Sequence, residues 1–79
     1  MISIKDLLNK IKWDKSLDPD EFLIGYEDRI ENTIIEIPYS AIKKVEKNFI
    51  VIEKDLEEVD IPLHRIRVVK QKGKIIWKR

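Results

Sequence analysis

The chain has 79 residues and a net charge of only +1, although 39% of its residues are charged. Its length suits one domain, residues 1–79, near the lower size limit for folding without a disulfide or a metal. It contains no Cys, which excludes a disulfide framework and a cysteine-based zinc site. The core must therefore come from apolar packing, with self-association as a further source of stability.

Membrane insertion and secretion are not expected either. No apolar run approaches the roughly 18 residues that a membrane span needs, and the N-terminus lacks the charged-then-apolar layout of a signal peptide. We expect a soluble cytoplasmic protein with no membrane partner. Frequent Ile, Lys and Glu, with only two Gly and three Pro, are typical of heat-stable proteins, although an AT-rich gene would give a similar bias.

A helix is predicted over residues 3–12. Ser3 can cap its start, because Asp6 follows three residues later in a pattern like a capping box. The loop after the helix contains Pro19, which keeps residues 15–20 out of it. Apolar residues recur at the helical period and mark the buried face of the helix: Ile4, Leu7, Leu8 and Ile11.

The rest of the chain predicts strands that pair as antiparallel hairpins. In the first of them, Phe22, Ile24 and Tyr26 share one face. A helix from Ser40 to Val45 is an alternative to a strand there, although its apolar face would be thin. The extended segments cover residues 22–29, 34–37, 42–46, 49–54, 57–61, 65–70 and 74–78.

The last hairpin turns at residues 71–73. We expect an α+β fold in which the N-terminal helix packs on a bent antiparallel sheet of about five or six short strands, and this sheet could close into a barrel. Strict alternation in the last hairpin then puts Ile66, Val68, Ile75 and Trp77 on the core side, and Arg65, Arg67 and Lys78 together on the outside.

Positive charge is concentrated at the C-terminal end. Residues 64–79 hold three Arg and four Lys but no acid, and His64, the only histidine, stands at their start. Residues 18–36 hold seven acids against one Arg, and residues 53–60 hold five acids against one Lys. The basic segment therefore either pairs with these acidic strands or presents a cationic surface to a phosphate-bearing partner.

Two arginines of this segment are the first candidates for a phosphate site. Arg65 and Arg67 stand at i and i+2 of a predicted strand, so they should point the same way. Each guanidinium carries a fork of donors that matches phosphate oxygens, and His64 could hydrogen-bond a phosphate or a ribose hydroxyl. The alternative is that both arginines pair with acids near residues 28 and 57–58, while His64 caps a turn.

Three further residues could contribute to such a site. Arg29 adds a third guanidinium, and the rings of Tyr26 and Trp13 could stack on a nucleobase. Core packing of Tyr26 and an ion pair of Arg29 are the more frequent outcomes for such residues. A chain this small also needs its large aromatic side chains inside, which favours a core position for both Trp13 and Trp77.

Catalytic and metal-binding signatures are missing. The sequence has no glycine-rich phosphate loop and no pair of histidines at zinc spacing, and residues 18–21 fail the EF-hand pattern. We therefore expect no catalytic residue, no metal and no cofactor. A phosphoesterase that uses His64 as its only acid or base is the weaker alternative.

Several motifs keep their order along almost the whole chain, with none in residues 40–58: Leu7–Asp14 (LLNKIKWD), Gly25–Arg29 (GYEDR), Glu36–Pro38 (EIP), Ile61–Ile66 (IPLHRI) and Gly73–Trp77 (GKIIW). Together they resemble the RNA cyclic group end recognition domain, a family of small, largely archaeal, uncharacterised proteins that is also found fused to eukaryotic RNA-related proteins. The resemblance implies binding of RNA ends that carry a 2′,3′-cyclic phosphate, in RNA repair or processing. It points to Tyr26, Asp28, Arg29, His64, Arg65 and Trp13.

The sequence thus favours a non-enzymatic module that binds phosphorylated RNA ends. Arg65 and Arg67 would hold the terminal phosphate, His64 would contact a ribose or phosphate oxygen, Arg29 would add charge, and Tyr26 or Trp13 would stack the last base. The main alternative is a protein-interaction or assembly module without nucleic acid. In that case the acidic strands of one copy would meet the basic hairpin of another in a homo-oligomer.

Overall fold

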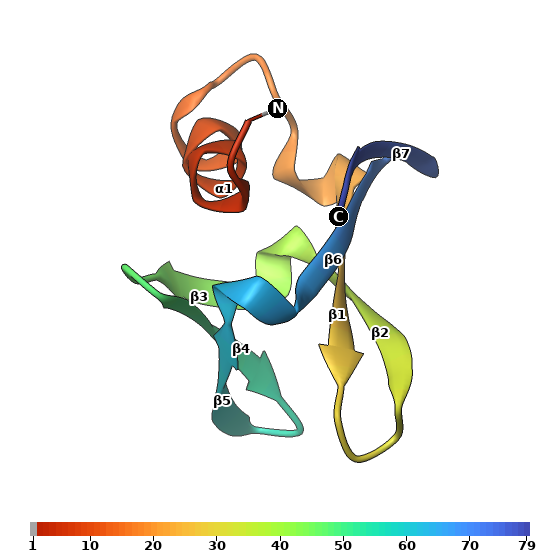
Figure 1. The fold of residues 1–79 in the computed structure, drawn as a ribbon. Helices are drawn as coiled ribbons and strands as arrows, with labels where there is room; N and C mark the ends of the chain where they lie inside the picture. Colours follow the sequence, from red (N-terminus) through yellow and green to blue (C-terminus); the bar gives the residue numbers. More distant parts are fainter. Residues whose placement is uncertain (1) are drawn as a thin grey trace.

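One helix is followed by seven strands within residues 2–79, which the computed structural model describes (Figure 1). The predicted α+β class is confirmed, and residues 42–45 form a strand rather than the alternative helix. Three 3-10 turns lie between the elements: η1 Pro19–Glu21, η2 Tyr39–Ala41 and η3 Leu63–Arg65. The helix is α1 Ile4–Trp13, and the strands are β1 Phe22–Asp28, β2 Thr33–Pro38, β3 Ile42–Val45, β4 Phe49–Lys54, β5 Glu57–Pro62, β6 Ile66–Gln71 and β7 Lys74–Lys78.

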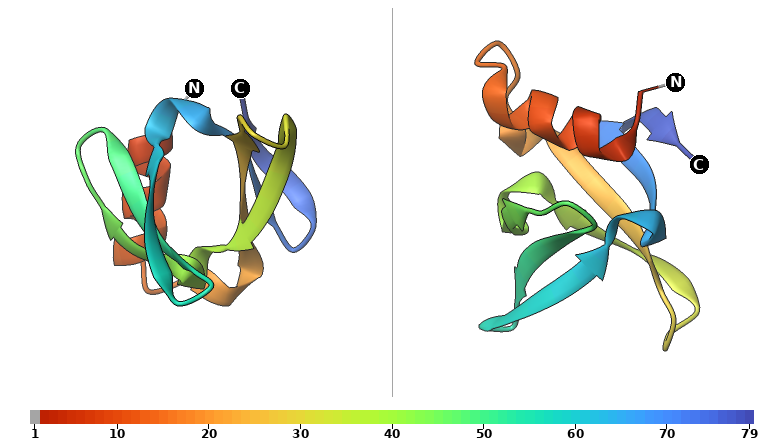
Figure 2. Two further views of the ribbon diagram at one scale, coloured as in Figure 1. Left: turned by 90° about the horizontal axis from the view of Figure 1, so that it is seen from below. Right: turned by 60° about the vertical axis from the view of Figure 1, so that its left-hand side comes forward.

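The strands form two antiparallel sheets, not the single bent sheet of five or six strands that was predicted. One sheet has the order β2-β1-β6-β7 and the other β3-β4-β5, and they face each other across the core (Figure 2, left). The chain crosses between them through η2 and η3, each preceded by a proline at the end of a strand. Because Pro38 and Pro62 have no N–H for a further ladder bond, pairing stops there, and the predicted barrel is not closed.

The helix covers one end of the space between the sheets, at the top of Figure 1. Its start is capped as predicted, because Ser3 Oγ accepts a hydrogen bond from the Asp6 amide at 3.1 Å. Tyr39 of η2 ties the helix to the sheets, since its hydroxyl donates to the Leu8 carbonyl oxygen at 3.1 Å. The predicted apolar face is buried: Ile4, Leu7, Leu8 and Ile11.

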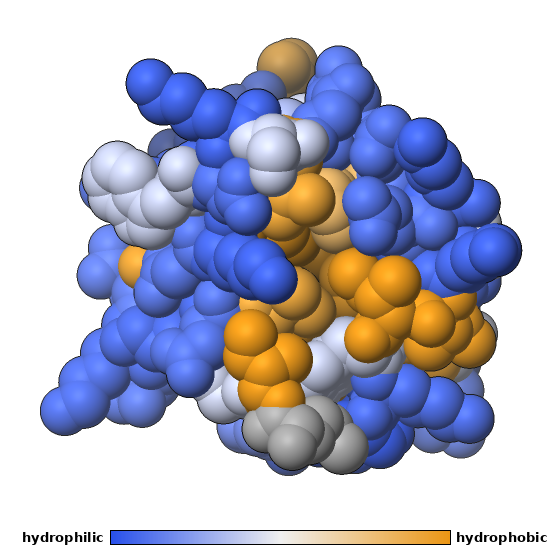
Figure 3. All heavy atoms as spheres, turned by 90° about the horizontal axis from the view of Figure 1, so that it is seen from above, coloured by the Kyte–Doolittle hydropathy of each residue, from blue (hydrophilic) through white to orange (hydrophobic). Residues whose placement is uncertain are grey.

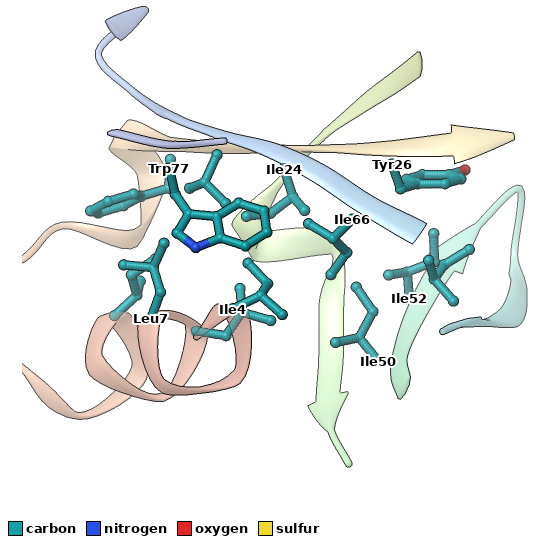
Figure 4. Close-up of a cluster of buried hydrophobic side chains, with 13 residues drawn as sticks. Ile4, Leu7, Ile24, Tyr26, Ile50, Ile52, Ile66 and Trp77 are labelled. Carbon is teal, nitrogen blue, oxygen red and sulfur yellow. The ribbon is translucent and has the colours of Figure 1, made fainter. Parts of the chain in front are cut away.

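One row of cross-strand partners, which ends at Trp77 of β7, shows how the four-stranded sheet builds the core. Figure 4 shows Trp77 of this row facing Ile4 and Leu7 of α1, while Ile50 and Ile52 of β4 lie on the side of the other sheet. The helix and both sheets therefore share a single core. The row takes one residue from each of β2, β1, β6 and β7, in that order: Ile37, Ile24, Val69 and Trp77.

A bulge in β6 explains why the predicted core position of Val68 is wrong. The register against β1 is interrupted between Ile66 and Val68, which leaves Arg67 as an extra residue. An extra residue shifts the alternation of faces by one. Val69 is therefore fully buried in place of Val68, which lies opposite Gly25 on the outer face.

A second bulge, in β7, has the same effect on Ile75. The register against β6 is interrupted between Trp77 and Ile75, so Ile76 is the extra residue. Trp77 is buried as predicted, but Ile75 is 55% exposed. The outer face of the sheet thus carries apolar side chains that strict alternation would put in the core.

Hydrophobic residues also reach the surface at the α1 end of the molecule. Seen from above, a strip of them lies between hydrophilic regions (Figure 3). Trp13, at the end of α1, is 73% exposed, so the core position favoured for it is wrong. No helix within residues 2–79 is long and apolar enough to cross a membrane.

Candidate functional site

A pocket of about 230 Å³ lies between the β1–β2 and β4–β5 hairpins. Both hairpins project away from α1, so the pocket is at the opposite end of the molecule from the helix (Figure 1). It brings together side chains from both sheets and from the turn that joins them. We call it the inter-hairpin pocket, and its lining consists of residues 26–30, Lys54, residues 59–61 and Arg65.

Arg65 occupies the turn η3, where the chain passes from one sheet to the other. Its Nε atom is buried and has no hydrogen-bond partner among residues 2–79. The turn is held by Arg79, whose Nη2 donates to the carbonyl oxygens of Leu63 at 2.7 Å and Ile66 at 2.9 Å. A buried donor without an acceptor costs about 1–3 kcal/mol, which makes Arg65 the first candidate in this pocket for contact with an acceptor group.

The other two cations of the pocket are Arg29 and Lys54, both exposed. Like Arg65, neither forms an ion pair with residues 2–79. The turn that carries Arg29 is shaped by Asp28, whose Oδ1 accepts hydrogen bonds from the amides of Ile30 at 2.8 Å and Glu31 at 3.2 Å. Asp28 of the Gly25–Arg29 motif therefore shapes the turn in which Arg29 lies.

Three carboxylates balance the three cations of the lining, namely those of Glu27, Asp28 and Asp60. Glu27 is engaged by Arg67, with 3.1 Å between its Oε2 and the arginine Nη2. Asp60 has no ion pair within residues 2–79. No group of three His, Cys, Asp or Glu side chains in this part of the chain is arranged to hold a metal ion. An anion in the pocket would thus meet donors and like charges at close range.

Arg67 does not join Arg65, so the prediction that the two point the same way is wrong. Arg65 lies in a turn rather than a strand, and Arg67 lines a second depression, of about 600 Å³, on the outer face of the four-stranded sheet. Lys78 lies with Arg67 there, as predicted. We call this depression the sheet-face groove, lined by Ile34 and Glu36 of β2, residues 67, 68 and 70 of β6, and Ile75, Lys78 and Arg79 at β7.

The predicted stacking residues do not meet at the pocket. Tyr26 lines it but is only 4% exposed, and its ring packs in the core (Figure 4). It has no free face for a base, which corrects the stacking prediction for Tyr26. Trp13 and His64 are exposed but line neither depression. The structure therefore brings together Tyr26, Arg29 and Arg65, and it separates them from Trp13.

Sequence reasoning missed Lys54 and Asp60, which the β4–β5 hairpin contributes to the pocket. They belong to residues 53–60, where one lysine stands among five acids, and that isolated cation was the available signal. It also missed the groove beside Gly25. A glycine in the interior of a strand often marks a close approach to its backbone, and this was the signal for the groove.

Comparison with known proteins identifies the family of this chain. Residues 1–79 match the family described as MJ1316 RNA cyclic group end recognition domain. The UPF0248 protein of Saccharolobus islandicus (strain L.S.2.15) is 36% identical over 81 residues, which cover 99% of this chain and 100% of the relative. A UPF0248 protein of Metallosphaera sedula is 33% identical over 78 residues, covering 99% of this chain and 94% of the relative.

A third relative, the UPF0248 protein of Saccharolobus solfataricus, is 32% identical over 81 residues, covering 99% of this chain and 98% of the relative. No solved structure matches the chain significantly. The family match and these archaeal relatives extend over practically the whole chain. The chain therefore belongs to the MJ1316 RNA cyclic group end recognition domain family.

Proposed function

We propose that this chain is an RNA-end binding module that recognises a terminal phosphate, above all a 2′,3′-cyclic phosphate, in the inter-hairpin pocket. The observation that carries the proposal is the buried Nε of Arg65, which lacks a partner among residues 2–79. A guanidinium matches phosphate oxygens with parallel N–H donors. The family description, which names RNA cyclic group ends, supports the same class of ligand.

The size of the pocket favours an end group over a length of strand. Its volume of about 230 Å³ lies below the roughly 300–1,000 Å³ of pockets that enclose drug-sized ligands. It suits a phosphate and its ribose, with the base outside. Arg29 and Lys54, exposed beside Arg65, would add charge for the approach of an anion.

The charge balance of the pocket favours a cyclic phosphate over a linear one. A cyclic phosphodiester carries one negative charge, whereas a terminal phosphate monoester carries nearly two at neutral pH, because its second pKa is about 6. The lining has as many carboxylates as cations. The second charge of a linear phosphate would therefore be placed near the unpaired Asp60, while the single charge of the cyclic form is matched by Arg65.

The proposed activity is binding without turnover, in RNA repair or processing. His64 is exposed and does not line the pocket, so no observation favours a phosphoesterase that relies on it. We assign Arg65 to the phosphate, and Arg29 and Lys54 to the surrounding charge.

The test uses fluorescence anisotropy with three short RNAs that differ only in their 3′ end: a 2′,3′-cyclic phosphate, a 3′-phosphate and a hydroxyl. The cyclic end should bind most tightly. Arg65→Ala should weaken its binding about 10- to 100-fold, since hydrogen bonds to charged groups contribute roughly 1.5–3 kcal/mol each. Arg65→Lys keeps the charge but loses the fork of donors. Its affinity for the cyclic end should therefore lie between those of the unaltered protein and Arg65→Ala.

Lys47→Ala is the matched control, because it removes an exposed cation that lines neither depression. It should leave the preference for the cyclic end unchanged. Equal binding of the three ends by the unaltered protein would contradict end recognition. Unchanged affinity in Arg65→Ala would remove the inter-hairpin pocket from the proposal.

A further inference from the structure

We propose that the sheet-face groove is a second RNA-binding surface, which holds the nucleotides that precede the end in the inter-hairpin pocket. The inference rests on the proposed function, but it concerns other residues on another face of the molecule. The groove, at about 600 Å³ against about 230 Å³ for the pocket, is the larger of the two depressions. Its volume lies within the range of sites that enclose whole ligands.

The floor of the groove exists because β1 has a glycine at its centre. Gly25 is the direct partner of Glu36 on β2 and of Val68 on β6. A Cβ atom at this position would collide with Val68 Cγ1 and lie 3.0 Å from Ile34 Cγ2. These two side chains therefore close over bare backbone, and with Ile75 they form an apolar floor that faces solvent. The groove therefore offers a small apolar surface against which the flat face of a base could pack.

The rim of the groove is strongly cationic. Four cations line it against the single carboxylate of Glu36: Arg67, Lys70, Lys78 and Arg79. Two of them form partly exposed ion pairs, Arg67 with Glu27 at 3.1 Å and Lys70 with Glu36 at 2.6 Å. Ion pairs that stay in contact with solvent contribute little to stability, so phosphates could replace these carboxylates at modest cost. Lys78 forms no ion pair with any described residue.

Single-stranded RNA fits this combination, because it presents apolar base faces and a regular row of phosphates to the same surface. The two depressions adjoin at one ion pair. Glu27 lines the inter-hairpin pocket, Arg67 lines the sheet-face groove, and the two side chains are 3.1 Å apart. Nucleotides that precede an end in the pocket would therefore have the groove within reach. With both surfaces, the chain would bind an RNA end more tightly when several nucleotides precede it.

The test compares adenosine 2′,3′-cyclic phosphate with a pentanucleotide that carries the same cyclic end. The mononucleotide reaches only the pocket, so the pentanucleotide should bind about tenfold more tightly or better through its additional contacts. Lys78→Ala and Ile75→Glu should remove most of this gain and leave the mononucleotide affinity unchanged. Lys78→Ala should also reduce the salt dependence of pentanucleotide binding by about 0.7 in slope, the value for one phosphate on a single strand.

Two matched controls lie on the same strand. Lys74 is exposed on β7 but does not line the groove, and Ile76 is 44% exposed there, close to the 55% of Ile75, but does not line it either. Lys74→Ala and Ile76→Glu should leave both affinities unchanged. Circular dichroism of all four variants separates a loss of binding from a loss of fold.

Three outcomes would overturn the inference. The pentanucleotide could bind no better than the mononucleotide, or the groove variants could bind it as well as the unaltered protein. Alternatively, light scattering could show a dimer that Ile75→Glu dissociates without an effect on RNA, which would assign the groove to a second copy of this chain. Failure of the proposed function looks different. In that case the mononucleotide does not bind and the end group makes no difference, while the groove variants still reduce binding of the pentanucleotide.

Discussion

Asp60 is the residue of the inter-hairpin pocket that we expect to set its preference among anions. Of the three carboxylates there, Glu27 pairs with Arg67 and Asp28 accepts hydrogen bonds from backbone amides. Asp60 alone forms neither an ion pair nor a side-chain hydrogen bond with residues 2–79. Its charge is therefore the one that would act on a bound phosphate without compensation.

Asp60→Asn should narrow the preference for cyclic over linear ends by about two- to fivefold, the effect of a single exposed charge. The doubly charged linear phosphate gains more from the loss of a carboxylate than the singly charged cyclic form does. Anisotropy titrations of both RNAs near pH 7.5 measure the ratio. Glu57→Gln, an exposed acid on the same strand outside the pocket, is the control. A ratio that Asp60→Asn leaves unchanged would show that charge balance does not set the preference.

Residues of the site could be found from the sequence where a motif carried them. Arg29 and Arg65 were predicted and lie in one pocket, because the guanidinium chemistry of phosphate binding depends on residue type. Their separation from Arg67 could not be predicted. It depends on a turn that ends before Ile66 and on a bulge in β6. Neither feature produces a periodic pattern of residues in the sequence.

The β4–β5 hairpin turns on two residues that both adopt a left-handed backbone, Asp55 with φ 52° and Leu56 with φ 67°. Such turns favour Asn-Gly or Asp-Gly, because a side chain with a Cβ costs about 1–2 kcal/mol in this conformation. Leu56 is also 95% exposed, so its side chain contributes almost no packing. The hairpin that carries Lys54 is therefore closed under local strain.

Leu56→Gly should raise the free energy of unfolding by about 1 kcal/mol, because it removes the strain while leaving the core intact. For a domain of this size the thermal midpoint should rise by about 4–8 °C. Gly73→Ala is the converse control, since Gly73 has φ +82° and a Cβ there would meet nothing within 4 Å. It should lower the midpoint by a similar amount. A lower midpoint for Leu56→Gly would refute this account of the turn.

At the scale of elements, the predicted segments of helix and strand agree closely with the structure. Local signals were sufficient there. The cap at Ser3, the periodic apolar face of α1 and the prolines at strand ends each depend only on residues nearby in the chain. The faces of β6 and β7 were wrong for Val68 and Ile75. A bulge is fixed by the partner strand and not by the strand itself, so a period read along one segment cannot reveal it.

The hydroxyl of Tyr39 links the helix to the crossing between the sheets, so its titration should affect the whole molecule. Burial raises the pKa of Tyr39 above its usual value of 10.0. The folded state then keeps the proton at a pH where the unfolded chain has lost it. This stabilisation is complete below pH 10 and is lost as the pH rises through the folded pKa.

Tyr39→Phe should cost about 1 kcal/mol at neutral pH, because the hydrogen bond to the Leu8 carbonyl oxygen is lost. Above pH 10 its stability should fall less steeply than that of the unaltered protein. Urea unfolding at pH 7 and near pH 11 measures both. The pKa of Lys43 is also raised, chiefly by its hydrogen bond with Glu53, but this contribution is common to both proteins. Parallel losses of stability would exclude Tyr39 as the titrating group.

The division into two sheets was the main feature of the whole molecule that the sequence did not predict. The seven extended segments were recognised, and their hairpin partners were largely correct. Which hairpins share a sheet depends on the pairing of β1 with β6, whose partner residues are 40 to 49 positions apart in the chain. No local pattern encodes such a pairing, and the prolines that end β2 and β5 fit either a bent sheet or two separate ones.

The helix and the inter-hairpin pocket lie at opposite poles of one core, and this separation has an evolutionary consequence. Substitutions of exposed residues in the hairpin turns leave the apolar face by which α1 seals the interior unchanged. A change in the ligand that the pocket accepts would therefore not require a change at the helix. Ligand specificity in this architecture could therefore diverge by single substitutions, while the helix end of the core stays the same.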